Sequence, residues 1–360
     1  MSYFAVEKKK IGWVGVHTNA DKLSLAKVEG IEYQFVTGKD EFKIGDDVMY
    51  FPIDSVLPKA LSDFLNITNF LTGKDHDRVK TVKLRGEYSQ GLCVNSKKID
   101  EFLQIQGINN MPIANEDYTA ILGVTKYEPP PILEKGGNLV RLPDFVSAYD
   151  IEGADNYADV IAYLMDKKVW ISEKAEGTNY GVSFTMLDNK FFVNQHHHAI
   201  EEIDGVSHTF WKIARENGLL DLVKAVFDKY KGVNATLRGE LIGSKIQGDY
   251  YDLKAFDVKL YEAEINGDPI DAGDFLRIMK ELGREADVVP TIAVDVTLGE
   301  WLNGRTVREA SNGKSLINPD KLREGIVIKP MKEERVEIGK FKGRLFIKQR
   351  SPEYLSKTEN

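Results

Sequence analysis

The stretch SEKAEGTNYGVSF, residues 172–184, sets a lysine between two glutamates and follows them with Gly-Thr-Asn and an apolar run. The run YGVSF is typical of a β-strand, and the glycine before it is typical of a turn. Lys174 is therefore expected at the junction of a turn and a strand, with Glu173 and Glu176 beside it. Taken alone, the pattern also fits a surface turn with a local ion pair, so other parts of the chain have to distinguish the two.

Charged residues recur in strand-like surroundings at four further places. These are RGELIG at 238–243, LKAFDVK at 253–259, REGIVIKP at 323–330 and FIKQRSPEY at 346–354. Successive side chains of a strand point to opposite faces, so Lys348 and Arg350 share one face. Two carboxylates, Glu240 and Glu324, and these cations are expected to meet Lys174 in one cleft. Phosphoryl or nucleotidyl transfer requires such a set.

Each of these places also has a structural explanation. Glu240 can pair with Arg238 on an exposed strand, and such surface pairs contribute about 0–1 kcal/mol to stability. Lys348 and Arg350 can form a charged sheet edge that discourages further strand pairing. Their occurrence together, in one order along the chain, favours a catalytic site over these separate explanations.

Helical periodicity appears at two places in the second half of the chain. The segment 218–230 places Leu219, Leu222, Val223, Val226 and Tyr230 on one face, and the segment 271–283 does the same with Phe275, Ile278, Met279 and Leu282, with Gly283 as a helix stop. The strand-like runs around them are YGVSF (180–184), KFFVN (190–194), ATLRGEL (235–241), LKAFDVKLY (253–261), GIVIKP (325–330) and RLFIKQ (344–349). Because these runs outnumber the helices without alternating with them, the sequence predicts an α+β fold with antiparallel sheets.

Residues 1 to about 125 consist of short strand-like runs separated by turns: IEYQFVTG (31–38), DDVMYFPID (46–54), VKTVKLRG (79–86) and GLCVN (91–95). This spacing predicts a small barrel or sandwich, and an OB-like barrel is one candidate. The segment 126–143 has three consecutive prolines and a Gly-Gly pair, which mark a boundary. We therefore predict a first domain at 1–125, for which an OB-like nucleic-acid-binding barrel is the candidate, a linker at 126–144 and a second domain at 145–360.

Composition narrows the class of protein. No apolar run approaches the roughly 20 residues that span a bilayer, and the start of the chain lacks a signal-peptide pattern. The single cysteine, Cys93, excludes an internal disulfide and fits a reducing cytoplasm, so we expect a cytoplasmic protein. A net charge of −8 argues against non-specific coating of nucleic acid, although RVKTVKLR at 78–85 carries four basic residues and no acid.

In this order the motifs resemble those of covalent nucleotidyltransferases, the polynucleotide ligases and mRNA-capping enzymes. Lys-x-Glu-Gly-Thr-Asn at 174–179, Gly-Glu-Leu-x-Gly at 239–243, Phe-Asp-Val at 256–258, Glu-Gly-Ile-Val-Ile-Lys at 324–329 and Ile-Lys-x-Arg-Ser-Pro-Glu-Tyr at 347–354 resemble motifs I, III, IIIa, IV and V. The form of motif I resembles RNA ligases. The segments 41–58 and 78–92 resemble the OB domain that precedes the catalytic domain in the RNA ligase 5 family, so the likeness covers most of the chain. It implies a nucleotidyltransferase domain with an ATP-grasp-like ligase fold.

The resemblance implies an ATP-dependent RNA ligase that forms phosphodiester bonds and releases AMP and pyrophosphate. Lys174 would attack the α-phosphate of ATP to form lysyl-AMP, the AMP would pass to an RNA 5′-phosphate, and a 3′-OH would displace it. The implied substrate is nicked duplex RNA, in RNA repair. Adjacent carboxylates favour the protonated form of a lysine, so we expect Mg²⁺ or Mn²⁺ among Glu176, Glu240 and Glu324, held mainly through water.

Further roles are implied by position. Lys348 and Arg350 would hold the α-phosphate, with Lys329 as a further phosphate contact. Phe256 would stack on the adenine, and Glu173 would contact the base through its backbone. Asn179 would reach the ribose or the RNA, and His196 stands where relatives have an arginine. The candidate RNA contacts in the first domain are Arg78, Lys80, Lys83 and Arg85.

The chain departs from the family pattern at three positions. Many relatives have Asp or His where this chain has Glu176, and lysine where it has Arg350, in addition to the change at His196. These changes keep two alternatives open: a capping-type guanylyltransferase that uses GTP, and a catalytically silent nucleic-acid-binding protein. A zinc site at His196–His198 is disfavoured, because on a strand only the first and third histidines share a face.

Overall fold

The computed structural model describes residues 3–73, 75–108, 117–128, 138–205, 208–244, 246 and 248–358. The chain divides into two compact units. Of the described residues, the N-terminal unit contains those up to 128 together with 153–158 and 352–358, and the C-terminal unit contains 138–152 and 159–351. The three prolines and the Gly-Gly pair of the predicted linker lie outside the described residues.

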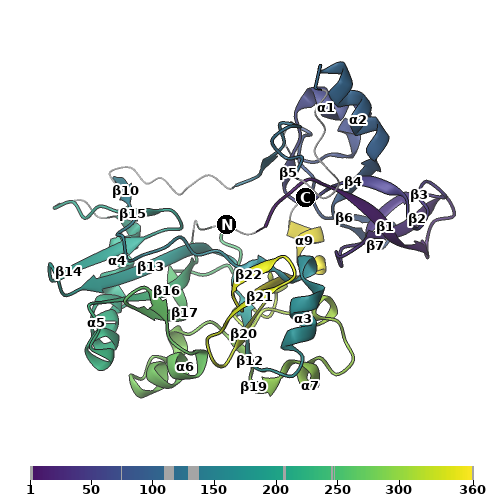
Figure 1. Cartoon of the computed structure of the whole chain (residues 1–360). Coiled ribbons are helices and arrows are strands. Elements are labelled where there is room, and N and C mark those ends of the chain that lie inside the picture. Colours follow the sequence, from purple (N-terminus) through teal and green to yellow (C-terminus); the bar gives the residue numbers. More distant parts are fainter. Residues whose placement is uncertain are drawn as a thin grey trace. The chain divides into compact units, whose positions relative to one another are not determined.

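An antiparallel sheet with the strand order β3-β2-β1-β4-β8 forms the centre of the N-terminal unit (Figure 1). Its strands are β1 (Glu7–Val16), β2 (Leu23–Val28), β3 (Phe35–Gly38), β4 (Asp47–Phe51) and β8 (Leu92–Asn95). The two edges meet where the Gln90 N–H donates to the Gln34 carbonyl at 2.8 Å. The sheet therefore curls into a nearly closed barrel, which confirms the predicted OB-like fold.

Short elements complete this unit: β5 (Ser55–Val56), α1 (Lys59–Phe64), η1 (Thr68–Phe70), β6 (Val82–Leu84), β7 (Glu87–Ser89), α2 (Ser96–Ile105), β9 (Thr125–Lys126), η2 (Ala154–Asn156) and α9 (Pro352–Thr358). Cys93 is buried on β8, as its strand context predicted. The strand predicted at 79–86 is shorter than expected and covers only β6. Arg85 has a φ of 48° and forms the turn into β7.

Two antiparallel sheets build the C-terminal unit. One has the order β10-β15-β14-β13-β16-β17-β18 and the other contains β23-β20-β12-β19. The first consists of β10 (Leu139–Arg141), β13 (Thr178–Thr185), β14 (Lys190–Asn194), β15 (His198–Ile200), β16 (Asn234–Ile242), β17 (Asp257–Ile265) and β18 (Asp268–Pro269). The second consists of β12 (Lys168–Lys174), β19 (Thr291–Thr297), β20 (Gly325–Pro330) and β23 (Ile347–Arg350), and the two-residue β11 (Glu152–Gly153) belongs to it. The antiparallel α+β prediction is thus confirmed.

Helices α4 (Thr209–Glu216), α5 (Leu219–Tyr230) and α6 (Ala272–Glu281) share one apolar cluster with the seven-stranded sheet. Alternate residues of β13, namely Tyr180, Val182 and Phe184, face this cluster. Position 179 therefore belongs to the opposite face of β13, away from the helices. The remaining elements are α3 (Ala158–Leu164), η3 (Glu285–Asp287), α7 (Leu298–Leu302), α8 (Val307–Ser311), β21 (Arg335–Ile338) and β22 (Phe341–Arg344).

Both predicted helices are present, with one correction at the end of α6. Phe275, Ile278 and Met279 are buried as expected, but Leu282 lies beyond the last helical residue and is 38% exposed. Gly283 follows with a φ of 66°, which is the left-handed conformation that ends a helix. A second correction concerns the strand predicted at 344–349: it is interrupted, because β22 ends at Arg344 and β23 begins at Ile347. No helix among the described residues is long and apolar enough to cross a membrane.

Candidate active site

Strand register brings the first and fourth motifs into contact. Lys174, the last residue of β12, pairs with Gly325 of β20, and Gly325 pairs on its other side with Arg350 of β23. Glu324 immediately precedes Gly325, and its Oε2 lies 2.6 Å from Lys174 Nζ. Residues 150 positions apart in the sequence thus form an ion pair at the centre of the C-terminal unit.

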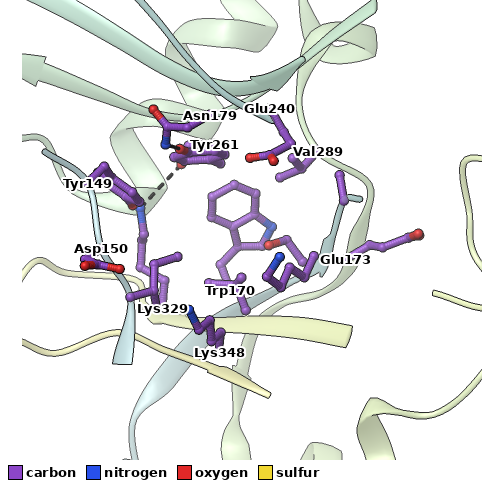
Figure 2. A pocket seen from close by; sticks show the side chains of 15 residues that line it. Tyr149, Asp150, Trp170, Glu173, Asn179, Glu240, Tyr261, Val289, Lys329 and Lys348 are labelled. Atoms are coloured by element: carbon purple, nitrogen blue, oxygen red, sulfur yellow. Dashed lines mark hydrogen bonds between the residues drawn. The ribbon is translucent and has the colours of Figure 1, made fainter. Parts of the chain in front are cut away.

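A cavity of about 140 Å³ opens beside this pair (Figure 2). On β12 it is lined by Trp170, Ser172 and Lys174, which alternate along the strand and therefore share a face. On the neighbouring strands it is lined by Val327, Lys329 and Lys348. The lining also includes Tyr149, Asp150, Ile151, Glu173, Ala175, Asn179, Glu240, Tyr261 and Val289. The two sheets thus supply opposite walls.

The seven-stranded sheet contributes three polar groups to the cavity. Asn179 and Glu240 are direct partners in the β13–β16 register, and Asn179 Nδ2 donates to the Tyr261 hydroxyl at 3.1 Å. Tyr261 is the extra residue of a β-bulge, because Arg238 pairs with Glu262 while Gly239 pairs with Leu260. Asn179 Oδ1 is buried and has no hydrogen-bond partner among the described residues, so it is available to a ligand hydroxyl.

Aromatic rings provide the apolar surface of the cavity. Trp170 is 2% exposed, lies centrally in the view of Figure 2, and donates from Nε1 to Thr291 Oγ1 at 3.0 Å. Tyr149 and Tyr261 approach each other with ring centroids 5.1 Å apart. Aromatic walls with a few converging polar groups are typical of small-molecule binding sites.

The charge of Lys174 reflects two opposing influences. Burial lowers the pKa of Lys174, but the negative charges of Glu324, Glu240 and Glu176 outweigh it, so this pKa stands above its ordinary value. Lys174 is therefore an ammonium ion paired with Glu324 in this structure. A nucleophilic role requires that this proton be removed.

Two other cavity residues have shifted pKa values. Burial, together with the nearby Lys174, lowers the pKa of Lys348 to about 8. Burial raises the pKa of Glu240 to about 8 against the opposing effect of Lys174, and the negative charges of Glu324 and Glu176 raise it further. Perturbed cations and carboxylates that share one cavity are typical of functional sites.

Lys329 lies on β20, lines the cavity and is held by an ion pair with a buried carboxylate. Its Nζ lies 2.5 Å from Glu262 Oε2, and Glu262 also binds Arg344 Nη2 at 2.6 Å. Burial opposes ionisation of Glu262, but Lys329 and Arg344 dominate and lower its pKa to about 2. Glu262 is therefore a permanent carboxylate at neutral pH.

Glu173 contributes to the cavity from a fully buried position. Its side chain is 1% exposed, and its Oε2 accepts from the Leu316 backbone N–H at 2.6 Å. Its own backbone N–H donates to the Pro290 carbonyl at 2.9 Å. The predicted backbone contact to a base would therefore fall to the Glu173 carbonyl, and it stays a prediction.

Five of the predicted catalytic and nucleotide-binding residues do not line this cavity, and one of them, Glu324, is next to it through its ion pair with Lys174. Glu176 lies in the turn after β12, where its backbone N–H donates to the Tyr251 hydroxyl at 2.8 Å. Arg350 Nε lies 3.5 Å from Glu324 Oε1, on the side away from Lys174 Nζ. Phe256 packs against the apolar cluster of the unit, and His196 lies in the bend between β14 and β15.

The structural explanation offered for Glu240 is wrong. Arg238 is fully buried and forms a two-bond ion pair with Glu264, at 2.8 and 2.9 Å, so it does not pair with Glu240 on an exposed strand. Glu324 is 5% exposed and pairs with Lys174. Neither glutamate belongs to a solvated surface pair.

Carboxylate oxygens are the groups with which this site would hold a divalent cation. Among the described residues no three His, Cys, Asp or Glu side chains are grouped for direct coordination of a metal ion. Glu240 is nevertheless held where burial, Glu324 and Glu176 all oppose its ionisation. A divalent cation would remove that penalty, and Mg²⁺ retains several waters in such sites. The residues thus fit a metal that is bound largely through water.

The predicted RNA contacts lie on the N-terminal unit. Arg78 forms an ion pair with Asp54 and lies 3.6 Å from the centre of the Tyr127 ring. Lys83 on β6 lies 4.9 Å from the centre of the Tyr88 ring. Arg78 is thus engaged within the unit, whereas Lys83 and Arg85 are exposed on and next to β6.

Sequence reasoning missed Tyr149, Asp150, Trp170 and Tyr261. Trp170 had a usable signal that was not used: the run VWI at 169–171 is strand-like, and on a strand Trp170 shares a face with Lys174 four residues later. Tyr261 had none, since a bulge reverses the alternation on which such a prediction depends. Tyr149 and Asp150 belong to no motif.

Comparisons with known proteins identify the family of the chain. A family model described as OB-fold domain matches residues 5–96, and one described as RNA ligase matches residues 167–348. A mutant of the Naegleria gruberi RNA ligase, solved with ATP and Mn, is 25% identical with a TM-score of 0.77 over 98% of each chain. The same ligase with PPi is 25% identical with a TM-score of 0.76 over 99% of each chain. No curated protein matches the sequence. Because the ligase model spans half of the chain, the protein belongs to the RNA ligase family.

Proposed function

We propose that this protein is an ATP-dependent RNA ligase that joins 3′-OH and 5′-phosphate ends through a lysyl-AMP intermediate at Lys174. The observation that carries the proposal is the placement of Lys174, Lys329 and Lys348 in one aromatic-walled cavity, with Glu324 2.6 Å from Lys174 Nζ. The similar Naegleria gruberi ligase has been solved with ATP, AMP, PPi and Mn. These ligands support ATP and a divalent metal as the cofactors here.

In the first step Lys174 Nζ would attack the α-phosphate of ATP. An N–P bond forms, the bond between the α-phosphorus and the bridging oxygen breaks, and pyrophosphate leaves. The ammonium proton must depart first, and the Glu324 carboxylate is its adjacent acceptor. Lys348 and Lys329, with Arg350 behind Glu324, would balance the charge of the phosphates.

A divalent metal, when bound, would neutralise phosphate charge and lower the pKa of Lys174. Glu176, Glu240 and Glu324 would hold it, chiefly through water. Asn179, whose Oδ1 is unsatisfied, would bind the ribose. Trp170, Tyr149 and Tyr261 offer the aromatic surface for the base.

In the second step an RNA 5′-phosphate oxygen would attack the phosphorus of lysyl-AMP, and Lys174 would leave as the amine. In the third, an RNA 3′-OH would attack the 5′-phosphate and release AMP. We propose nicked duplex RNA as the substrate, since A-form shape and 2′-hydroxyls allow RNA to be distinguished from DNA. The OB-like barrel would contact that duplex through Lys80, Lys83 and Arg85. We propose the cytoplasm as the compartment in which the protein acts.

Intact-protein mass spectrometry tests the first step. Purified protein is freed of bound nucleotide and mixed with Mg²⁺ or Mn²⁺ and either ATP or GTP. We expect an added AMP mass from ATP, and no adduct in Lys174→Ala. Lys168→Ala is the matched control, because Lys168 lies at the exposed start of the same strand.

The alternatives predict different masses. A GMP adduct would identify capping-type chemistry. The absence of any adduct with either nucleotide would leave the nucleic-acid-binding alternative. If AMP is added, sealing of a nicked RNA duplex, compared with the same nick in DNA and with single-stranded RNA, tests the choice of substrate.

A further inference from the structure

Glu262 lies behind the cavity wall and belongs to none of the sequence motifs. It is on β17 directly after the bulged Tyr261 and is 1% exposed. Its carboxylate binds Lys329 Nζ at 2.5 Å, Arg344 at 2.6 and 3.1 Å, and the Tyr149 hydroxyl at 3.3 Å. Two of these partners, Lys329 and Tyr149, line the cavity.

The dependence of Lys329 on Glu262 is one-sided. Arg344 has a second carboxylate, because Glu333 binds its guanidinium at 2.6 and 3.0 Å. Among the described carboxylates only Glu262 pairs with Lys329, whose Nζ also donates to the Tyr261 carbonyl at 3.4 Å and lies 5.6 Å from the centre of the Phe346 ring. Loss of the Glu262 charge would therefore leave Arg344 paired and Lys329, which is 5% exposed, as an uncompensated buried cation.

The bulge in β17 links this pair to the cavity. Because of the bulge, the Tyr261 ring lines the cavity, and the carboxylate of the next residue, Glu262, contacts Lys329 Nζ. One short segment therefore sets an aromatic wall and the counter-ion of a cavity cation together. A buried pair that served stability alone would need no partner in the cavity wall.

We infer that Glu262 is a positioning residue for nucleotidyl transfer, which fixes the Lys329 ammonium group at the phosphate side of the cavity. The inference rests on the proposed function, because it takes the phosphates of ATP as the ligand of Lys329. Glu262 itself touches no substrate and acts through Lys329.

Its test is a double-mutant cycle on the rate of AMP addition, measured over a range of ATP concentrations. The variants are Glu262→Gln, Lys329→Gln and the double variant, in the full chain. We expect each single change to slow adenylylation at least about tenfold. The double variant is expected to match Lys329→Gln within about twofold, because Glu262 has no effect once Lys329 is absent.

Glu264→Gln is the matched control. Glu264 lies two residues further along β17, is 3% exposed and pairs with Arg238, without any contact with Lys329. Neutralising it reproduces the structural cost of removing a buried carboxylate, and we expect a change in rate below about threefold. An equal loss in both variants would show that Glu262 only supports the fold.

The outcomes separate the inference from the function on which it rests. If the wild-type protein forms no AMP adduct, the proposed function fails. If the wild-type protein forms it and Glu262→Gln does so at an unchanged rate, or if the two single losses multiply in the double variant, the positioning role is wrong. If Glu262→Gln does not fold, two other variants allow the same comparison of adenylylation rates. The double variant buries no unpaired charge, and Glu262→Asp keeps the carboxylate but shortens its reach to Lys329.

Discussion

Gly325 allows a close approach between β20 and β23, the strands that carry the fourth and fifth motifs. It lies between Lys174 on β12 and Arg350 on β23. A Cβ at this position would lie 2.1 Å from the Gln349 carbonyl oxygen and 2.8 Å from the Arg350 Cα. Both atoms belong to the backbone, so no side-chain rotation can relieve the overlap. Gly325→Ala therefore has to displace β23 itself.

The size of the displacement follows from the distances. A carbon–oxygen contact needs about 3.2 Å, so the Gln349 carbonyl has to move by roughly 1 Å. Overpacking of this kind costs about 1–3 kcal/mol of stability. A misplacement of about 1 Å lowers catalytic rates by about 10²-fold. Lys348 lies on the displaced strand, so we expect adenylylation to fall by about two orders of magnitude in a protein that remains folded.

Single-turnover addition of AMP, followed by mass spectrometry, and thermal unfolding measure the two effects. Gly273→Ala, in helix α6, is the control, because its Cβ would meet the flexible Met331 Cε at 3.3 Å and the Met331 carbonyl oxygen only at an ordinary contact distance of 3.8 Å. The control is expected to keep full activity. A Gly325→Ala protein that adenylylates at the wild-type rate would refute the reasoning from strand spacing.

Three further predictions concern charge, metal and the cavity wall. The pKa of Lys348 is lowered to about 8, so this side chain loses its charge as the pH rises through 8, and the rate of adenylylation should decline with it. Lys348→Arg, which stays charged, should extend activity to higher pH. An identical decline at alkaline pH in both proteins would argue against a role for the Lys348 charge. Removal of divalent metal with EDTA should abolish the AMP adduct, and Mg²⁺ or Mn²⁺ should restore it; full adduct formation in EDTA would contradict a metal requirement. Trp170→Phe loses the hydrogen bond to Thr291 and part of the cavity wall, so thermal unfolding should show a loss of about 1–2 kcal/mol of stability. The ATP concentration needed for half-maximal adenylylation should rise, and an unchanged ATP dependence would exclude a binding role for Trp170.

Local patterns predicted several elements of the catalytic half of the fold. KFFVN and GIVIKP coincide with β14 and β20, and the apolar face predicted for 218–230 is the buried face of α5. The predictions that failed depended on distant partners. Strand β1 was not predicted, since it contains three consecutive lysines, and two of them are paired by Asp100 and Asp47 from remote segments.

The site shows the same division. Motif spacing indicated Lys174, Glu324, Lys329 and Lys348, because residues on adjacent strands keep their alternation. It did not indicate Glu262, whose position depends on a one-residue bulge opposite Arg238 and Gly239. A bulge leaves no fixed signal in a single sequence, so side chains beyond it are assigned to the wrong face.

The grouping of helix α9 with the N-terminal unit has a consequence for synthesis on the ribosome. Residues 352–358 are made only after the whole of 159–351 has been translated. Domains usually fold in the order in which they emerge. Here the barrel emerges first, yet its unit is the last to be completed.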